Sequence, residues 1–202
     1  MAQKSTEHGV DLEQYAKFIE HATANPEDAM LGLGATGFAE GRPMHTLAKL
    51  GGYSYGGEDV RRETRDYSLQ LGGFKEVEAD AGFVDPADRP EPVEVALAAL
   101  TGCINATLDV VALENGIDLD HLETRVSADL DPRVFFGIRD VEHGDETYDD
   151  ITIDVEVGGP DLTDEDAAIL REGVARSPVF NLVSRAHEMT PEMRMNDESR
   201  TA

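Results

Sequence analysis

The feature that most constrains the fold is a long apolar helix predicted for residues 93–114, which carries the only cysteine of the chain, Cys103. Asn115-Gly116 predicts the end of this helix, because both residues tolerate the left-handed conformation that stops helices. Apolar side chains recur on nearly every side of it, at Val93, Leu97, Leu100, Cys103, Ile104, Leu108 and Val111. A helix that is apolar all round is typical of a buried core, so other segments have to cover it.

The segments on both sides of this helix mix helical and strand patterns. Before it, the pattern predicts an amphipathic helix over 9–25, strands within 31–41, 45–50 and 64–71, and a loop over 85–92. After it, the pattern predicts strands over 122–130, 134–141 and 151–157, a helix capped by Thr163, a short helix starting at Ser177-Pro178, and a strand over 187–195. This order predicts an α+β fold.

The charge of the chain excludes several classes of partner. It has 42 Asp and Glu against 17 Lys and Arg, a formal net charge of -25. The acidic residues are dispersed and lysine is scarce, which is typical of a folded protein from a halophile that keeps molar salt in its cytoplasm. No basic face is visible for nucleic acid. No apolar run approaches the roughly 20 residues of a membrane span, and no signal peptide is visible, so we expect a cytoplasmic protein.

Two motifs with possible chemistry have a plainer interpretation. Gly32-Leu-Gly34-Ala-Thr-Gly37 matches a dinucleotide fingerprint, but that motif should follow a strand and open a helix, and here a helical stretch precedes it. The pairs around His143 and His187 lack metal-ligand spacing. We therefore expect no cofactor and no metal.

Three stretches resemble the OsmC/Ohr family of osmotically inducible and organic hydroperoxide resistance proteins. The segment Pro92-Val-Glu-Val-Ala-Leu-Ala-Ala-Leu-Thr-Gly-Cys103 resembles the start of the family's central helix. Residues 35–42 resemble its N-terminal strand, and residues 176–181 the segment that holds a second cysteine before a proline. The resemblance divides the chain into an N-terminal helical extension (1–30), an OsmC-like domain (31–195) and a polar tail (196–202).

The resemblance implies a fold and an activity. The fold is an intertwined homodimer in which antiparallel sheets surround the central helices, each buried against strands of the partner subunit. The activity is thiol-dependent reduction of hydroperoxides, in which Cys103 attacks the peroxide and a second cysteine resolves the sulfenic acid as a disulfide.

The chain departs from the family pattern at three positions. Ser177 stands where the resolving cysteine is expected, so a two-cysteine cycle is ruled out. The arginine of the N-terminal strand aligns with Ala39, and Arg42 follows three residues later. In the Ohr branch the paired carboxylate lies ten residues before the cysteine, a position that Val93 holds here. Glu94 lies nine residues before the cysteine, a spacing that resembles other OsmC-like branches.

Cys103 requires help from elsewhere in the fold to become a thiolate. It lies about ten residues into its helix, and the helix dipole acts mainly in the first turn. We expect a cation from another part of the fold to stabilise the thiolate, with Arg42 as the first candidate. Further candidates are Arg61, Arg62, Arg65 and His45. Without a cation, burial raises the pKa of a thiol and leaves it inert.

Three functions remain open. The first is a one-cysteine peroxide reductase in which Cys103 is the nucleophile, Glu94 supports the site, Arg42 stabilises the thiolate and an external thiol completes the cycle. The second is a non-catalytic member of the family that binds a small apolar or thiol ligand at the dimer interface, in a pocket lined by Phe135, Phe136 and Phe180. The third is a stress-induced scaffold whose acidic helix at 9–25 contacts another protein.

Overall fold

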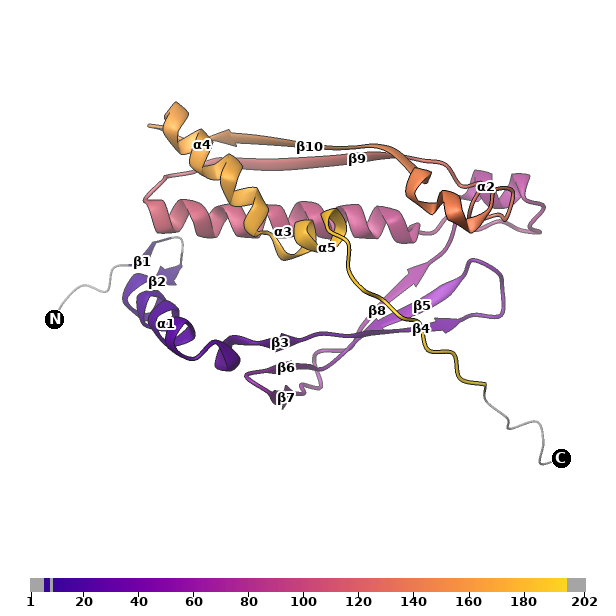
Figure 1. Ribbon diagram of the computed structural model, residues 1–202, viewed down its shortest axis with the longest axis horizontal. Helices are drawn as coiled ribbons and strands as arrows, with labels where there is room; N and C mark the ends of the chain where they lie inside the picture. Colours follow the sequence, from indigo (N-terminus) through magenta and orange to yellow (C-terminus); the bar gives the residue numbers. More distant parts are fainter. Residues whose placement is uncertain (1–5, 8, 196–202) are drawn as a thin grey trace. The chain divides into compact units, whose positions relative to one another are not determined.

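The computed structural model describes residues 6–7 and 9–195, so the predicted polar tail at 196–202 lies outside the described residues. The chain divides into two compact units, residues 1–97 and residues 98–202, which are described separately below (Figure 1).

The first unit opens with the predicted amphipathic helix. Strand β1 (Thr6–Glu7) pairs with β2 (Val10–Asp11), and α1 spans Leu12–Ala24, followed by the 3-10 turn η1 (Pro26–Ala29). The Asp11 carboxylate accepts hydrogen bonds from the backbone N–H groups of Glu13 and Gln14, which fixes the start of α1. The prediction for 9–25 is confirmed, although no residue of α1 is buried.

Two small antiparallel sheets complete most of this unit. One has the order β3 (Leu31–Gly32), β6 (Tyr53–Tyr55) and β7 (Glu58–Val60), and the other β4 (Ala35–Ala39), β5 (Thr46–Leu50) and β8 (Tyr67–Leu71). The predicted strands are confirmed, and Gly56-Gly57 forms the β6–β7 turn with positive φ at both residues. The glycine motif at 32–37 lies on β3 and β4, which is a strand context and not the start of a helix.

A short helix that the sequence pattern did not predict follows. Helix α2 spans Lys75–Asp80, and its N-cap residue Phe74 offers no side-chain hydrogen bond. Its sequence is polar and only six residues long, which gives no readable periodicity. Residues 81–91 have no regular secondary structure, in agreement with the predicted loop.

The central helix α3 spans Pro92–Asn115 and matches the prediction in position. Its buried side chains form one stripe rather than covering all sides: Leu100, Ile104, Leu108, Val111 and Ala112. The expectation that no segment approaches the length of a membrane span is wrong for this helix, which is long and apolar enough by length and composition, with a window of mean hydropathy 1.7. The same test is passed by core helices of soluble proteins.

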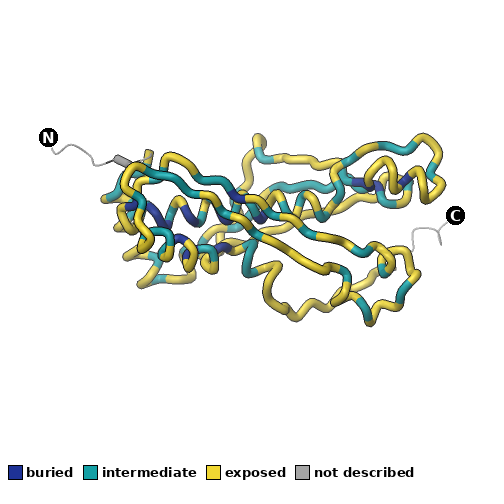
Figure 2. Tube along the Cα trace, turned by 90° about the horizontal axis from the view of Figure 1, so that it is seen from above, coloured by how far each residue is buried: buried dark blue, intermediate teal, exposed yellow. Residues whose placement is uncertain are grey.

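In the second unit a long hairpin packs on α3. Strand β9 (His121–Leu130) pairs antiparallel with β10 (Tyr148–Gly158), and both run alongside α3 in Figure 1. Figure 2 marks the buried residues of the chain in dark blue. The inward side chains of the hairpin, Leu122, Val126, Ile153, Val155 and Val157, pack against the buried stripe of α3. The hydroxyl of Thr124 also donates to Oδ1 of Asn105, 2.6 Å away, which ties β9 to the helix.

Two predicted strands are wrong. Residues 132–139 form turns and bends, because Asp131 accepts from the backbone N–H of Arg133 and Gly137 has a φ of +65°. The 3-10 turn η2 (Val141–Glu146) follows. Residues 185–195 have no regular secondary structure.

The C-terminal helices cover the open side of α3. Helix α4 spans Asp164–Gly173 and begins with a capping box between Thr163 and Asp166, as predicted. It continues into the 3-10 turn η3 (Val174–Arg176) and helix α5 (Pro178–Ser184), for which Ser177 is the N-cap. Leu170 of α4 is buried against the α3 stripe.

Candidate functional site

The Cys103 thiol lies where α3 meets the start of α5. Cys103 is half-buried, and the backbone N–H of Val179 points to its Sγ, with 3.4 Å between the nitrogen and the sulfur. An N–H donor favours the charged form of the group that accepts from it, so this contact assists a thiolate. The sequence offered no signal for it, because the donor is a backbone group 76 positions away in the chain.

Ser177 holds that donor in place. Its side chain is completely buried and accepts from the backbone N–H of Phe180 at 3.3 Å, which makes it the N-cap of α5. Pro178 occupies the first helical position, where its fixed φ suits the helix. The residue at the position of the family's resolving cysteine therefore has a structural role beside Cys103.

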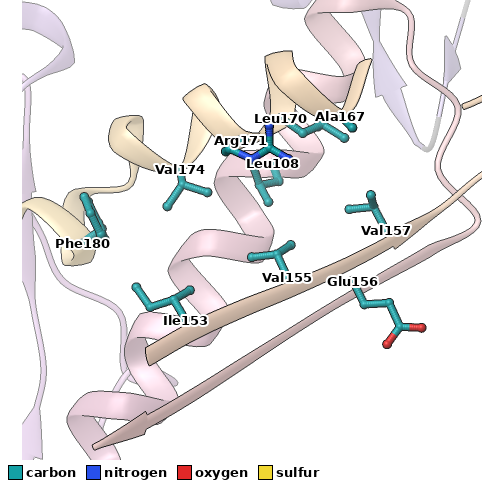
Figure 3. Close-up of a pocket in the computed structure, with 10 residues that line it drawn as sticks. All are labelled: Leu108, Ile153, Val155, Glu156, Val157, Ala167, Leu170, Arg171, Val174 and Phe180. Carbon is teal, nitrogen blue, oxygen red and sulfur yellow. The ribbon is translucent and has the colours of Figure 1, made fainter. Parts of the chain in front are cut away.

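An open apolar groove of about 700 Å³ lies between α4 and β10, over α3. Figure 3 shows its lining: Leu108, Ile153, Val155, Val157, Ala167, Leu170, Arg171, Val174 and Phe180, while Glu156 points away from the others. Phe180 is thus the one member of the predicted phenylalanine pocket that lines this groove. Phe135 and Phe136 instead stack edge to face, 5.0 Å between ring centroids, in the turn region at 132–139.

Glu94 caps the helix that carries Cys103. Its carboxylate accepts from the backbone N–H of Glu91 at 3.0 Å, and the Glu91 carboxylate accepts from the N–H of Val93 at 2.6 Å. This exchange resembles a capping box at the start of α3. Nine residues separate Glu94 from Cys103, which is about 13 Å along a helix and half a turn around it, so the two lie on opposite sides of α3.

Arg42 and His45 converge on a third residue, Glu78, which sequence reasoning missed. The Glu78 side chain is fully buried; Nε2 of His45 lies 2.6 Å from its Oε1, and Nη2 of Arg42 lies 3.3 Å from its Oε2. The backbone N–H of Ala87 also donates to Oε2 at 3.1 Å. Nη2 of Arg42 donates as well to the carbonyl of Val84. The structure brings two predicted cation candidates together around this carboxylate, in the unit that does not hold Cys103.

The partners of Glu78 decide its charge. Burial raises the pKa of this carboxyl, but the hydrogen bonds from His45 and Ala87 and the charge of Arg42 lower it more, so its pKa lies below the ordinary value. Glu78 is thus a carboxylate that joins the β4–β5 connection to α2 and to the loop before α3. No local pattern could reveal it, because its partners lie 33 and 36 residues away.

The other cation candidates have contacts within the first unit. Arg65 donates to the carbonyl of Gly51 at 2.9 Å and lies over the rings of Tyr53 and Tyr67. Arg61 lies 3.5 Å from the Asp59 carboxylate.

A mixed cluster on the outer face of the hairpin has metal-ligand residue types. His121, Glu123 and Glu156 each offer a ligand atom within 4.8 Å of the others. However, Arg125 already pairs with both carboxylates, at 2.7 Å to Glu123 and 3.5 Å to Glu156. Among the described residues this cluster is therefore organised as an ion-pair network.

Comparison with known proteins now gives the family. A profile of the OsmC-like protein family matches residues 85–192, which is more than half of the chain and includes Cys103. The chain belongs to the OsmC-like family. No curated protein sequence matches this chain.

The chain is also similar to several solved structures. An OsmC-like protein from Mycoplasma pneumoniae is 15% identical with a TM-score of 0.51, over 75% of this chain and 86% of that chain. An organic hydroperoxide resistance protein OsmC from Legionella pneumophila is 14% identical (TM-score 0.49, 75% and 88% covered), and OhrB of Bacillus subtilis is 18% identical (TM-score 0.41, 72% and 85% covered). The likeness to the Mycoplasma pneumoniae protein shows the fold alone, and together with the family profile it confirms the expected α+β, OsmC-like architecture around a central helix. The roles of Cys103, Glu94 and Arg42, and the division into an extension and a domain, stay predictions.

Proposed function

We propose that this OsmC-like protein reduces organic hydroperoxides through the single thiol of Cys103. The observation that carries the proposal is the hydrogen bond from the Val179 N–H to Cys103 Sγ, beside the buried cap Ser177 and at the edge of the apolar groove. It supplies a donor for a thiolate and an apolar surface for the organic part of a peroxide. Two of the solved relatives are named as organic hydroperoxide resistance proteins, which agrees with this substrate class.

The chemistry needs one thiolate and an external thiol. The Cys103 thiolate attacks one oxygen of the O–O bond; that bond breaks, the cysteine becomes a sulfenic acid, and the leaving alkoxide takes a proton to become an alcohol. An external thiol then attacks the sulfenic acid, releasing water and forming a mixed disulfide. A second external thiol frees Cys103 and leaves as a disulfide. Ser177 cannot replace the external thiol.

The other residues support this centre indirectly. Glu94 fixes the start of the helix that carries Cys103. Arg42 is the proposed cation: its two hydrogen bonds to Glu78 and Val84 are both made by Nη2, and a guanidinium has five N–H donors in all.

We also infer that the protein acts as a homodimer. Large side chains such as Val84, Leu33 and Ile138 are at least 70% exposed, in agreement with surfaces that a partner covers. A cytoplasmic location and a halophilic origin remain expectations from the composition.

The test is the alkylation of Cys103 in molar KCl with and without cumene hydroperoxide, together with consumption of this peroxide in the presence of dithiothreitol. We expect alkylation of the native thiol that peroxide abolishes, and activity that falls to background in Cys103→Ser. Ser127→Ala, on the outer face of β9, is the matched control for the effects of mutation and purification on both assays. Peroxide consumption that persists in Cys103→Ser would contradict this mechanism.

One observation favours a second candidate, a non-catalytic protein that binds a small apolar or thiol ligand. Arg42 already faces the buried Glu78 carboxylate, which offsets the positive charge that a thiolate requires. This candidate predicts that Cys103 is alkylated only on unfolding and that peroxide leaves it unchanged. Native mass spectrometry would then show a bound small molecule, and a dimer found repeatedly empty would argue against it.

A further inference from the structure

The register of the β9–β10 hairpin brings three side chains with metal-ligand atoms together on its outer face. His121 and Glu123 are two residues apart on β9, so both point to the side of the hairpin that faces away from α3. Glu156 of β10 is the direct partner of Glu123, and Figure 3 shows its side chain pointing away from the groove. Two like charges directly opposite each other destabilise a sheet. A cation between the two glutamates would remove this repulsion.

Arg125 meets this demand only in part. Its guanidinium lies 2.7 Å from Oε1 of Glu123 and 3.5 Å from Oε2 of Glu156, so it holds one oxygen of each carboxylate. The other two oxygens lie 4.0 and 3.9 Å from Nε2 of His121, which is too long for a hydrogen bond. Arg125 therefore orients both carboxylates and leaves one nitrogen and two oxygens close together with no hydrogen bond between the imidazole and either glutamate.

The separations of these three atoms suit a tetrahedral zinc ion. All three lie within 4.8 Å of one another. Ligand atoms about 2.1 Å from a tetrahedral zinc are about 3.4 Å apart, so each side chain needs to move by less than about 1 Å to bind one. Gly158 is the partner of His121 in the ladder and has no side chain, which leaves the imidazole room to move. The three side chains are between 45% and 62% exposed, so water can complete the coordination.

The donor atoms favour zinc over other abundant divalent ions. Imidazole nitrogen is a common zinc ligand, whereas Ca²⁺ and Mg²⁺ prefer oxygen ligands alone. The two glutamates outweigh the charge of Arg125, and the net charge of -25 attracts cations to the surface in general. The imidazole is what distinguishes this cluster from the many carboxylates around it.

We propose that His121, Glu123 and Glu156 bind one Zn²⁺ ion on the outer face of the hairpin. The ion joins β9 to β10 next to the side chains of both strands that pack against the buried stripe of α3. Bound zinc therefore stabilises the hairpin that covers the core of the second unit. This site does not rest on the proposed thiol chemistry.

Isothermal titration calorimetry of the full chain with Zn²⁺ tests the site, in 1 M potassium nitrate because molar chloride competes for zinc. We expect one site per chain that is tighter than the weak binding to other carboxylates. Loss of an outer-shell partner alone weakens a metal site 10–100-fold, so His121→Asn and Glu156→Gln should each weaken this one at least about tenfold. The matched control is His143→Asn, which should change nothing: its imidazole lies 3.0 Å from Oε1 of Glu146, a hydrogen-bond distance.

Thermal unfolding gives a second measurement that does not depend on the heat of binding. Zinc should raise the Tm of the native chain and of His143→Asn, because a ligand that binds only the folded state stabilises it. The Tm of His121→Asn should be close to the native value without zinc and should not respond to zinc. A tight site that persists in His121→Asn, an equal rise of Tm in both chains, or adventitious weak binding only in the native chain overturns the proposal.

Discussion

At the scale of single residues, Ser177 separates this chain from a two-cysteine enzyme. The serine is buried, caps α5 and holds the Val179 N–H at the Cys103 sulfur. We predict that Ser177→Cys restores a resolving thiol: one equivalent of cumene hydroperoxide should remove two free thiols per chain, as counted by thiol titration. Because cysteine caps a helix poorly, unfolding should become easier by about 1 kcal/mol.

The control for that experiment is the variant with both Ser177→Cys and Cys103→Ser, in which peroxide should leave the remaining thiol unchanged. If Ser177→Cys consumes peroxide and one free thiol per chain remains, position 177 does not reach the sulfenic acid of Cys103.

Glu94 provides a second residue-scale prediction, because capping and chemistry make different demands on it. Glu94→Gln keeps the acceptor for the Glu91 N–H, so its free energy of unfolding should stay within about 0.3 kcal/mol of the native value, whereas Glu94→Ala should lose about 0.5–1 kcal/mol. Urea denaturation measures both. Since Glu94 lies about 13 Å from Cys103 along α3 and on the opposite side of it, we also expect Glu94→Gln to keep most of its peroxide consumption; a loss of a hundredfold would mean that its charge acts in the reaction.

At the scale of elements, the buried Glu78 joins the β4–β5 connection, α2 and the loop that leads into α3. Its folded pKa is lowered, so the stability that its charge contributes is present above the unfolded pKa of about 4.3 and is lost as the pH falls through the folded value. Glu78→Gln should therefore lower the Tm at pH 7, and the difference from the native chain should shrink below pH 4. Thermal unfolding followed by circular dichroism at several pH values measures this.

Glu76→Gln, on the same helix, is the matched control and should leave the Tm nearly unchanged at every pH. A Glu78→Gln deficit that is constant from pH 7 to pH 3 would show that shape, and not charge, makes Glu78 important.

The same scale shows where sequence reasoning succeeded. Helices α1, α3, α4 and α5 could be predicted because their caps and periodicity are local: Asp11, Thr163 and Ser177 each bond to a backbone N–H two or three residues later. The strand predicted over 134–141 was wrong because Val134, Phe136 and Ile138 alternate like a strand, while Pro132, Gly137 and the Asp131–Arg133 contact fold them into turns. Apolar alternation alone cannot tell a strand from a loop whose apolar residues stay exposed.

The residues of the candidate site likewise fall into those that the sequence could predict and those that it could not. Cys103 and the cap Ser177 could be found, because the family motif and the Ser-Pro pair are continuous in sequence. Glu78 and the Val179 N–H could not, because His45 lies 33 positions from Glu78 and Cys103 lies 76 positions from Val179. The role of Arg42 could be guessed only as a cation, since its carboxylate partner had no sequence signal.

At the scale of the whole molecule, the net charge of -25 sets the conditions under which the fold is stable. Like charges repel across the surface, and salt reduces their range from about 10 Å at 0.1 M to about 3 Å at 1 M. We predict that the Tm rises by at least about 10 °C between 0.1 and 2 M KCl. Sucrose, which is uncharged, serves as the control and should raise it much less. A Tm independent of KCl would contradict an electrostatic limit on stability.

The small core also governs how the protein is made. Seven hydrophobic side chains are buried among the described residues, so the proposed homodimer would supply much of the stability of the fold. Refolding should then be second order in protein, with a rate that rises with chain concentration. In a cell, a newly synthesised chain would be most susceptible to proteolysis before it associates with a second chain. Proteases would therefore remove a larger share of the protein when expression is low. The abundance of the protein would respond more than proportionally to its rate of synthesis, which gives its expression a threshold without any dedicated regulator.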